Sequence, residues 1–450
     1  MDEPLQAGLA RFISRCEYNK IAEKFVDDAK LRVLDWIGCA VAGGGYPQTR
    51  MARQLMSVAG WNPQAFALGM PFDVPARSAA FINGIAGHVC ELDDGHRTAI
   101  GHPGSVTVPV AFALGQAQDS TGKDFLKAVI LGYDVFTRLG RMVNPTHYRC
   151  WHTTGTVGTF AAAAAASSLL KLTPDEVNNA LGLATTMNGG LVESFGSHAK
   201  ALNIAEACQN GIDAALLAKM GFTGSHSAIM GPKGFIAATC TDPHPENLEN
   251  PSEETLVSDT AFFKKYSSCG HTNSPLDGLC ALMKAHPDIK PEAVEKITVR
   301  TYRVAVDITS KLKAATEDEA KFSLPYCFAV QLMFGSVGLK QFAESIRKSP
   351  EVLALAKLVK VDEDPEATAA FPKHQATVEI TLKDGTTFVE KRLGSSDDAD
   401  LALVENKFES AAAMMDKDAL KEIEQIVLHL EDYPNILPLV AQLKTLKFKD

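Results

Sequence analysis

Apolar and polar residues alternate at helical spacing through most of the first half of the chain. This pattern predicts long helices over residues 21–43, 106–118, 125–143, 161–172 and 201–220. The tetrapeptide Thr173-Pro174-Asp175-Glu176 predicts a further helix start, in which Thr173 caps the N-terminus and Glu176 reaches back to it. Gly221 is expected to end the helix over 201–220, and the Gly-, Ser- and Pro-rich residues 221–234 to form a loop.

The pattern changes near residue 240. Residues 243–251 are polar and contain proline, which indicates a linker. Beyond them, residues 296–306 alternate as a strand does, and residues 377–382 and 387–393 predict a hairpin around a two-residue turn at Asp384-Gly385. Helices are expected over 326–334 and 337–346, and the last stretch, 405–446, is helical again.

These elements predict a mainly α protein with a large all-helical domain and a smaller α+β domain. Because the C-terminal helices resemble the first half in character, we expect them to pack back onto it. The helical domain is then discontinuous, with residues 1–255 plus 405–450, and the α+β domain takes residues 256–404. The sequence shows no fixed-period repeat, which argues against a helical solenoid.

Composition and charge narrow the class and the partners. Of the 450 residues, 46% are hydrophobic and 22% charged, so the chain can bury a large core. A formal net charge of -10 argues against a nucleic acid partner. The N-terminus lacks the basic start and apolar stretch of a signal peptide, and no apolar run reaches the roughly 18 residues of a membrane span. Nine cysteines without a C-x-x-C pair fit reduced thiols, so we expect a cytoplasmic location and no membrane partner.

The densest group of titratable residues runs from Glu91 to Arg97 and is followed by Gly101-His102-Pro103-Gly104. Two adjacent carboxylates, two histidines and flexible glycines are typical of a functional loop between helices. A helix end with solvated charges would have the same composition, and spacing alone leaves both interpretations open.

Two metal-site interpretations of this loop carry less weight. Asp93-Asp94 in a helical context resembles the aspartate-rich magnesium motif of terpenoid synthases, but Arg97 stands where that motif needs a third acid. A zinc site from His88, Asp93 and either His96 or His102 is conceivable, yet its spacing matches no common zinc pattern. We therefore predict no metal.

Three further groups place polar residues at a predicted helix start or domain boundary. In Trp151–Thr156, His152 and free backbone N–H groups could meet an anion, although a capping turn would have the same sequence. In Phe195–Lys200, a lysine near a helix N-terminus opposes the helix dipole, which hints at a function. Lys264–Asn273 opens the α+β region with a basic segment whose lysines could equally be solvated.

Taken together, these groups make the sequence resemble the MmgE/PrpD family, which includes 2-methylcitrate dehydratase, cis-aconitate decarboxylase and iminodisuccinate epimerase. The likeness runs along nearly the whole chain, and the order and spacing of its motifs make it specific. The motifs are Glu91-Leu92-Asp93-Asp94 with His102, Trp151-His152-x-Thr154-Gly155-Thr156, Gly221-Phe222-Thr223-Gly224, Gly231-x-x-Gly234-Phe235, the basic segment from Lys264 through Cys269, and Lys321-Phe322-Ser323-x-x-Tyr326.

The resemblance implies a helical domain with an α+β lid, a homodimer, and proton chemistry on a small di- or tricarboxylate without a cofactor. The activity it favours is that of a 2-methylcitrate-type dehydratase. Decarboxylation or epimerisation at the same site are the alternatives, and an inactive metabolite-binding relative is a more remote one. The residues implied as catalytic are Asp93, His102, His152, Lys200 and His271. Those implied as substrate-binding are His96, Arg97, Lys264, Lys265, Asn273 and Tyr326.

The chemistry of these residue types fits the implied reaction. His102 and His152 are expected to transfer protons, Asp93 to orient an imidazole or act as a base, and Lys200 to clamp a carboxylate.

The chain departs from the family pattern at a few positions. Asn273 stands where many relatives have a lid histidine, and Asn203, Ala205 and Gln209 stand where the helix after Lys200 often has His, Gly and Arg. Because an arginine is lost, these departures concern the substrate and not the fold.

Overall fold

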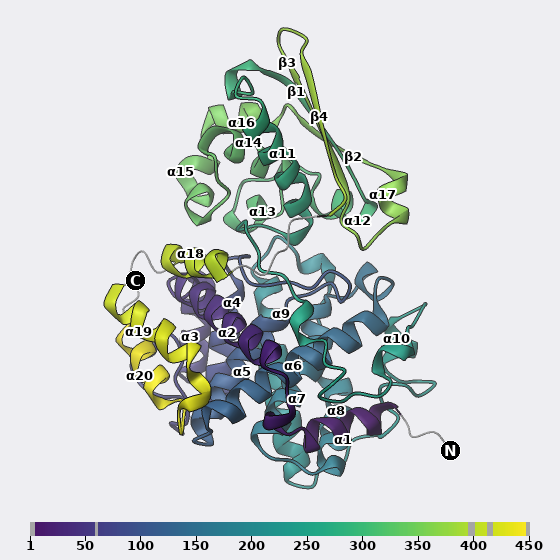
Figure 1. The fold of residues 1–450 in the computed structure, drawn as a ribbon, viewed down its shortest axis with the longest axis vertical. Helices are drawn as coiled ribbons and strands as arrows, with labels where there is room; N and C mark the ends of the chain where they lie inside the picture. The colour runs from purple at the N-terminus through teal and green to yellow at the C-terminus, as the bar shows by residue number, and fades with distance from the viewer. Residues whose placement is uncertain (1–4, 59–61, 395–400, 412–416, 447–450) are drawn as a thin grey trace.

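The computed structural model describes residues 5–58, 62–394, 401–411 and 417–446 (Figure 1). Its larger part is helical, and the C-terminal helices lie against α2 at one side of it. The helices of this part are α1 (Leu5–Arg15), α2 (Glu23–Gly43), α3 (Pro47–Met56), α4 (Ala76–His88), α5 (Pro103–Ala117), α6 (Gly122–Val143), α7 (Thr153–Leu169), α8 (Pro174–Met187), α9 (Ala199–Lys219), α10 (Phe235–Thr239), α18 (Leu401–Ala411), α19 (Lys417–Leu428) and α20 (Leu437–Thr445).

The smaller part is an α+β unit, at the top in Figure 1. Its sheet has the strand order β2-β1-β3-β4, with β1 parallel to β2 and antiparallel to β3. The strands are β1 (Val294–Thr301), β2 (Val359–Glu363), β3 (Ala376–Leu382) and β4 (Thr387–Arg392). The helices are α11 (Asn273–Ala285), α12 (Arg303–Thr309), α13 (Glu317–Lys321), α14 (Leu324–Phe334), α15 (Glu344–Arg347), α16 (Pro350–Ala356) and α17 (Pro365–Ala369).

Each part has its own hydrophobic core. One core joins buried residues between Leu9 and Phe263 to others from Val404 onward, and the second lies between Tyr266 and Leu382. The prediction of a mainly α protein with a smaller α+β domain is confirmed. The domain limits 1–255 plus 405–450 and 256–404 stay a proposal, and the chain ends and residues 395–400 and 412–416 within them lie outside the described residues.

The long helices of the first half form largely where the apolar spacing predicts them. Helices α2, α5, α6 and α9 match their expected ranges to within a few residues. Thr173 and Glu176 make the expected capping box at the start of α8. Gly221 follows α9 with a φ of 90°, a conformation that favours glycine. Helix α7 already begins at Thr153, ahead of the expected 161, so its N-terminus lies beside His152.

Small residues let α7 and α9 approach closely. A Cβ atom on Gly211 of α9 would lie 2.3 Å from the Cβ of Ala162 in α7, so only glycine fits there. All of α7 is buried, which explains why alanine fills both its sides. This packing fixes α7 beside α9, and α5 packs against both. Contacts of Gly155 with Asn203 and of His102 with Thr154 bring the N-termini of all three helices close to one another.

Three local predictions were wrong in detail. The strand expected over 296–306 ends at Thr301, because α12 begins at Arg303 and buries Ala305 and Thr309 at helical spacing. The hairpin turn has three residues, 383–385, since the Leu382 N–H donates to the Thr386 carbonyl. The helix expected over 337–346 is a short 3₁₀ turn at Leu339–Phe342 followed by α15.

The C-terminal helices return to the helical part, as the apolar pattern predicts. Helices α18 and α19 both pack on α2. Lys407 of α18 pairs with the buried Asp35 of α2 and donates to the Leu92 carbonyl at 2.8 Å. This chain segment therefore reaches the loop that carries the acidic motif. Among the described residues, no helix is both long and apolar enough to cross a membrane.

Candidate active site

Three helix N-termini meet beneath the α+β unit. His102 is the N-cap of α5, His152 is the N-cap of α7, and Lys200 lies in the first turn of α9. His88, the last residue of α4, lies between them, with its ring centroid 5.0 Å from that of His102 and 6.4 Å from that of His152. Helix N-termini carry partial positive charge, so this position favours an anion.

A network of buried charges supports these helix ends. His88 donates from Nδ1 to Asp93 Oδ2 at 2.8 Å and accepts at Nε2 from Lys200 Nζ at 2.8 Å. Lys200 also pairs with Glu91, whose second oxygen lies 3.2 Å from Lys264 Nζ. Lys264 Nζ is 3.8 Å from Asp93 Oδ1. Two carboxylates and two ammonium groups thus balance one another with almost no exposure to water.

His102 and His152 receive opposite tautomers from their partners. His102 Nδ1 lies 2.6 Å from the Asp94 carbonyl oxygen, so Nδ1 carries the proton and Nε2 keeps its lone pair. His152 Nδ1 lies 3.1 Å from the amide nitrogen of Asn203, which donates to it. The proton of His152 is therefore on Nε2, an atom without a partner among the described residues. One imidazole offers a base and the other an N–H donor.

Burial and charge set the ionisation of these groups. Burial lowers the pKa of His102 well below 6.5 and does the same for His152, so both rings are neutral near pH 7. Burial would raise the pKa of Asp93, but His88, His102 and Lys264 outweigh it and hold the pKa well below its usual value. Burial likewise opposes the charge of Glu91, yet Lys200 and Lys264 lower its pKa well below 4.5. Both acids are therefore ionised.

A small pocket of about 40 Å³ opens onto these groups. His102, His152, Lys200 and Glu91 line one part of it. Rings from both parts of the protein form its walls: Tyr148, Phe195, Phe262, His271, Phe322 and His374. Phe195 stacks edge-on against His152, with ring centroids 4.9 Å apart. This volume holds only a few water molecules, so the surrounding side chains leave little free space next to the polar groups.

The structure bears differently on the magnesium and the zinc interpretations of the acidic loop. The carboxylate of Asp94 accepts hydrogen bonds from the Tyr133 hydroxyl and the Gly104 N–H, and burial raises its pKa to about 7. Asp94 thus anchors the loop instead of sharing a magnesium ion with Asp93. Ligand atoms of His88, Asp93 and His102 do lie within 4.8 Å of one another, so the zinc interpretation named a real cluster. A metal there would replace the hydrogen bonds that orient both rings.

The structure brings most of the expected residues together. Asp93, His102, His152, Lys200 and Lys264 meet in one network, and His271 lines the same pocket from the α+β unit. His96 lines the pocket too, but Thr260 and the Ala99 N–H occupy both its ring nitrogens. Arg97 is half-buried against Phe262, with its guanidinium carbon 5.2 Å from the ring centre. These placements leave the assigned roles to be tested.

Five of the six expected substrate-binding residues are not among those that line the pocket, Arg97 and Lys264 included, which corrects their placement. The other three make contacts elsewhere. Lys265 is half-exposed and lies 3.5 Å from Asp277, because neighbouring residues of an extended segment point to opposite sides. Tyr326 is in the core of the α+β unit and donates to the Gln341 carbonyl. Asn273 begins α11 and is buried outside the residues that line the pocket. Matching the family motifs by position does not show which way each side chain points.

Several residues of the site were missed. Glu91 stands in the quoted motif but was not predicted as a site residue. Its φ of 53° is unusual for a residue other than glycine, and the sequence does not show this. Asn203, noted only as a departure, sets the tautomer of His152. His374 follows a loop with no motif around it, so the sequence carried no signal for it. Gln209, another departure in α9, is not among the residues that line the pocket.

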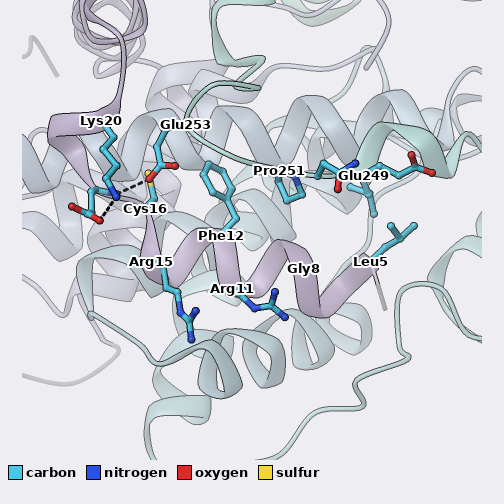
Figure 2. A pocket seen from close by; sticks show the side chains of 13 residues that line it. Leu5, Gly8, Arg11, Phe12, Arg15, Cys16, Lys20, Glu249, Pro251 and Glu253 are labelled. Atoms are coloured by element: carbon cyan, nitrogen blue, oxygen red, sulfur yellow. Dashed lines mark hydrogen bonds and ion pairs between the residues drawn. The ribbon is translucent and has the colours of Figure 1, made fainter. Parts of the chain in front are cut away.

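Larger hollows lie elsewhere on the surface. The one in Figure 2 holds about 830 Å³ between α1 and residues 248–253. Acidic and basic side chains both line it, as Glu17 and Lys20 do in an exposed ion pair. Another of about 770 Å³ lies under the loop over 222–235. Both are open, whereas the pocket at the helix N-termini combines burial with converging charges.

The pocket brings together two neutral imidazoles of opposite tautomer and the ammonium of Lys200, which are residue types that acid–base chemistry on a small anion uses. Comparison with known sequences gives the family. The MmgE/PrpD N-terminal domain matches residues 7–248 and the MmgE/PrpD C-terminal domain matches residues 266–432. The chain belongs to the MmgE/PrpD family.

Two activities occur among its named relatives. The chain is 27% identical to cis-aconitate decarboxylase from Mus musculus over 97% of its own length and 93% of that protein. It is 26% identical to the Homo sapiens cis-aconitate decarboxylase, with 99% and 95% covered. For 2-methylcitrate dehydratase from Salmonella typhimurium the identity is 25%, over 51% of this chain and 50% of that protein.

Proposed function

We propose that this protein is a lyase that decarboxylates a small tricarboxylate of the cis-aconitate type. The observation that carries the proposal is the extent of the similarity: it covers both parts of the chain for cis-aconitate decarboxylases but about half for a 2-methylcitrate dehydratase. The dehydratase, which the sequence motifs placed first, therefore becomes the second candidate.

The reaction suits the groups in the pocket. In such a decarboxylation the bond between a methylene carbon and its carboxylate breaks, and the freed electron pair forms a new double bond. The electron pair of the original double bond moves to the carbon of that bond farther from the lost carboxylate, and this carbon takes up a proton. The remaining carboxylates delocalise the developing charge, so the step needs a proton donor and fixed cations but no cofactor as electron sink.

Each polar group has a role in this scheme. Lys200 and the helix N-termini hold the carboxylates, and Lys264 keeps Glu91 and Asp93 ionised behind them. His102 accepts a proton at Nε2 when the anionic substrate enters, because Asp93 Oδ2 lies 3.5 Å from its Nδ1 and stabilises the cation. His102 then delivers the proton to carbon, while the Nε2–H of His152 holds a substrate oxygen.

Dehydration of a 2-methylcitrate-type substrate is the second candidate, and the opposite tautomers favour it. His102 Nε2 would remove a proton next to a carboxylate, and His152 would give its proton to the departing hydroxyl. Epimerisation needs the same proton removal without a leaving group. All nine cysteines are free thiols, which supports a cytoplasmic setting for either reaction. A homodimer is part of the same proposal and can be tested by light scattering.

Proton NMR in deuterium oxide tests these alternatives together. The purified protein is incubated separately with cis-aconitate, 2-methylcitrate, citrate and iminodisuccinate. Decarboxylation of cis-aconitate gives new vinyl methylene signals and a deuterium at the carbon that was protonated. Loss of water from 2-methylcitrate would instead support the dehydratase, and deuterium exchange at a retained carbon would support the epimerase. No change in any substrate would overturn the proposed substrate class.

A further inference from the structure

A second group of rings closes the pocket from the α+β unit. His271 Nδ1 lies 2.7 Å from the Tyr302 hydroxyl. The ring of His374 is stacked on Tyr302, with centroids 5.1 Å apart, and lies 5.4 Å from His271. The ring of Phe371 is stacked on His374 at 5.9 Å and lies 5.0 Å from Tyr302. These four rings form an aromatic cluster that the scheme above does not use.

His374 and His271 are the members of this cluster that line the pocket, and His374 has a ring nitrogen that no described residue pairs with. His374 lies between α17 and β3, with a φ of 44°, and only 5% of it is exposed. Its Nε2 is buried and has no hydrogen-bond partner among the residues that the structure describes. Buried polar atoms nearly always have a partner, so an unpaired one in a pocket indicates a place for a ligand atom.

The position of His374 separates it from the proton-transferring histidines. Ring contacts lead from His152 through Phe195 and Tyr148 to His271 and then to His374, with centroid distances of 4.9, 6.1, 5.9 and 5.4 Å. Phe195, Tyr148 and His271 lie along the wall between the two. Because Lys200 and His374 line the same small pocket, a molecule with acidic groups at both ends can meet Lys200 with one and His374 with the other.

The surroundings of His374 suit a carboxylate. The charged and titratable groups near it are Arg97, His271 and Tyr302, and no carboxylate is among the groups that shift its ionisation. Burial, with the charges of His271 and Arg97, lowers its pKa well below 6.5, so the ring is neutral until an anion arrives. An approaching carboxylate accepts from the ring and can stabilise its protonated form.

We propose that His374, backed by His271 and Tyr302, forms a second carboxylate subsite that holds the substrate carboxylate that does not react. The inference rests on the proposed function in taking the substrate to be a polycarboxylate. Because His374 belongs to the α+β unit and Lys200 to the helical part, one substrate bridges the two. The subsite therefore selects tricarboxylates over dicarboxylates.

Calorimetry with two inert probes tests the subsite. Propane-1,2,3-tricarboxylate and methylsuccinate differ only in one terminal carboxylate. The unaltered protein should bind the tricarboxylate at least tenfold more tightly. His374→Asn keeps a residue that tolerates positive φ; it should reduce this preference about tenfold and leave methylsuccinate binding within twofold. His286→Asn, a histidine of the same unit that stacks on Phe388, should change neither affinity.

Each other outcome has a definite meaning. If the preference survives in His374→Asn, or if both probes weaken equally, the subsite is wrong while the proposed function stands. If neither probe binds the unaltered protein, the polycarboxylate class fails, and the subsite with it. Thermal melting checks that the variant folds, and His374→Gln replaces it in the same comparison if it does not.

Discussion

His102 and His152 occupy equivalent places at the starts of two helices, yet their partners give them opposite chemistry. A backbone carbonyl of the acidic loop fixes one tautomer, and the side chain of Asn203 fixes the other. Neither partner follows from spacing, because one comes from a backbone position and the other from a helix that is distant in sequence. The motifs could therefore predict the two histidines but not the division of labour between them.

Replacing His102 should remove most of the activity. His102→Gln keeps a polar side chain of similar length but cannot carry a proton at the position of Nε2, so we expect turnover to fall by about 10²- to 10⁴-fold. Substrate binding should change much less, since Lys200 stays in place. Steady-state kinetics by NMR measures both, with His286→Asn as the matched control. Retention of a tenth of the turnover would show that His102 is not the proton donor.

Lys264 and Lys265 form a natural pair for comparison, since one is fully buried and its neighbour is half-exposed. Lys264→Met leaves Asp93 without a nearby ammonium and Glu91 with Lys200 alone, and should lower the free energy of unfolding by about 3 kcal/mol. Lys265→Met should stay within about 0.5 kcal/mol of the unaltered protein. Urea unfolding followed by circular dichroism measures both. Equal effects would mean that Lys264 does not compensate the buried acids.

At the scale of elements, helices were predicted better than the α+β segments. Long apolar periodicities gave α2, α5, α6 and α9, because each buries a face over several turns. Strand β2 escaped notice because it is short and half-exposed, and its pairing partner β1 is distant in sequence. The apolar residues at the start of α12 fit the two-residue period of a strand as well as the 3.6-residue period of a helix, because the segment is short. Helix and strand can therefore be told apart from the sequence where buried residues recur over several turns, and not in shorter segments.

Helix α18 should stabilise its packing on α2 through one buried ion pair. Lys407→Met removes the ammonium that pairs with the buried Asp35, and the expected cost is about 3 kcal/mol of unfolding free energy. Adding Asp35→Asn removes the carboxyl group that has lost this partner and should restore most of the loss. Chemical unfolding of the two single variants and the double variant forms the cycle. If the double variant is as unstable as the sum of the singles, the pair makes no direct contribution.

For the whole molecule, buried histidines predict sensitivity to mild acid. Burial lowers the pKa of His96 and His271 to about 3 and that of His147 to about 4, and lowers those of His102, His152 and His374 well below 6.5. The unfolded chain takes up protons at these positions near pH 6.5, whereas the folded protein does not. Stability is therefore fully present above pH 6.5 and falls below it, by about 1.4 kcal/mol per group for each pH unit.

Several acids oppose this trend. Burial raises the pKa of Asp94 to about 7 and also raises those of Asp28, Asp35, Asp134, Glu206, Asp213 and Asp318, so the folded state binds these protons first, which adds stability as pH falls. The six histidines outweigh Asp94 between pH 6.5 and 5, so the melting temperature should be level from pH 8 to 7 and fall steadily from 6.5 to 5. Calorimetric melting across this range is the measurement. A melting temperature that is unchanged at pH 5 would show that these rings accept protons in the folded protein.

Access to the pocket is a property of the whole molecule, since the closed volume of about 40 Å³ cannot admit a tricarboxylate. We therefore expect contacts between the two parts to break when a ligand enters. Asp318 of α13 makes one such contact outside the pocket, where Gln48 Nε2 lies 3.2 Å and His198 Nε2 3.4 Å from its carboxylate. Such partly exposed polar contacts each contribute up to about 1 kcal/mol.

Asp318→Ala should therefore loosen the closed state without touching the proton-transferring groups. We expect propane-1,2,3-tricarboxylate to dissociate about two- to fivefold faster, because the bound state loses a contact that the open state lacks. Stopped-flow displacement measures this rate. Glu344→Gln, which breaks an ion pair within the α+β unit alone, is the control and should leave the rate unchanged. Equal rates in all three proteins would mean that the ligand leaves without separating the two parts at Asp318.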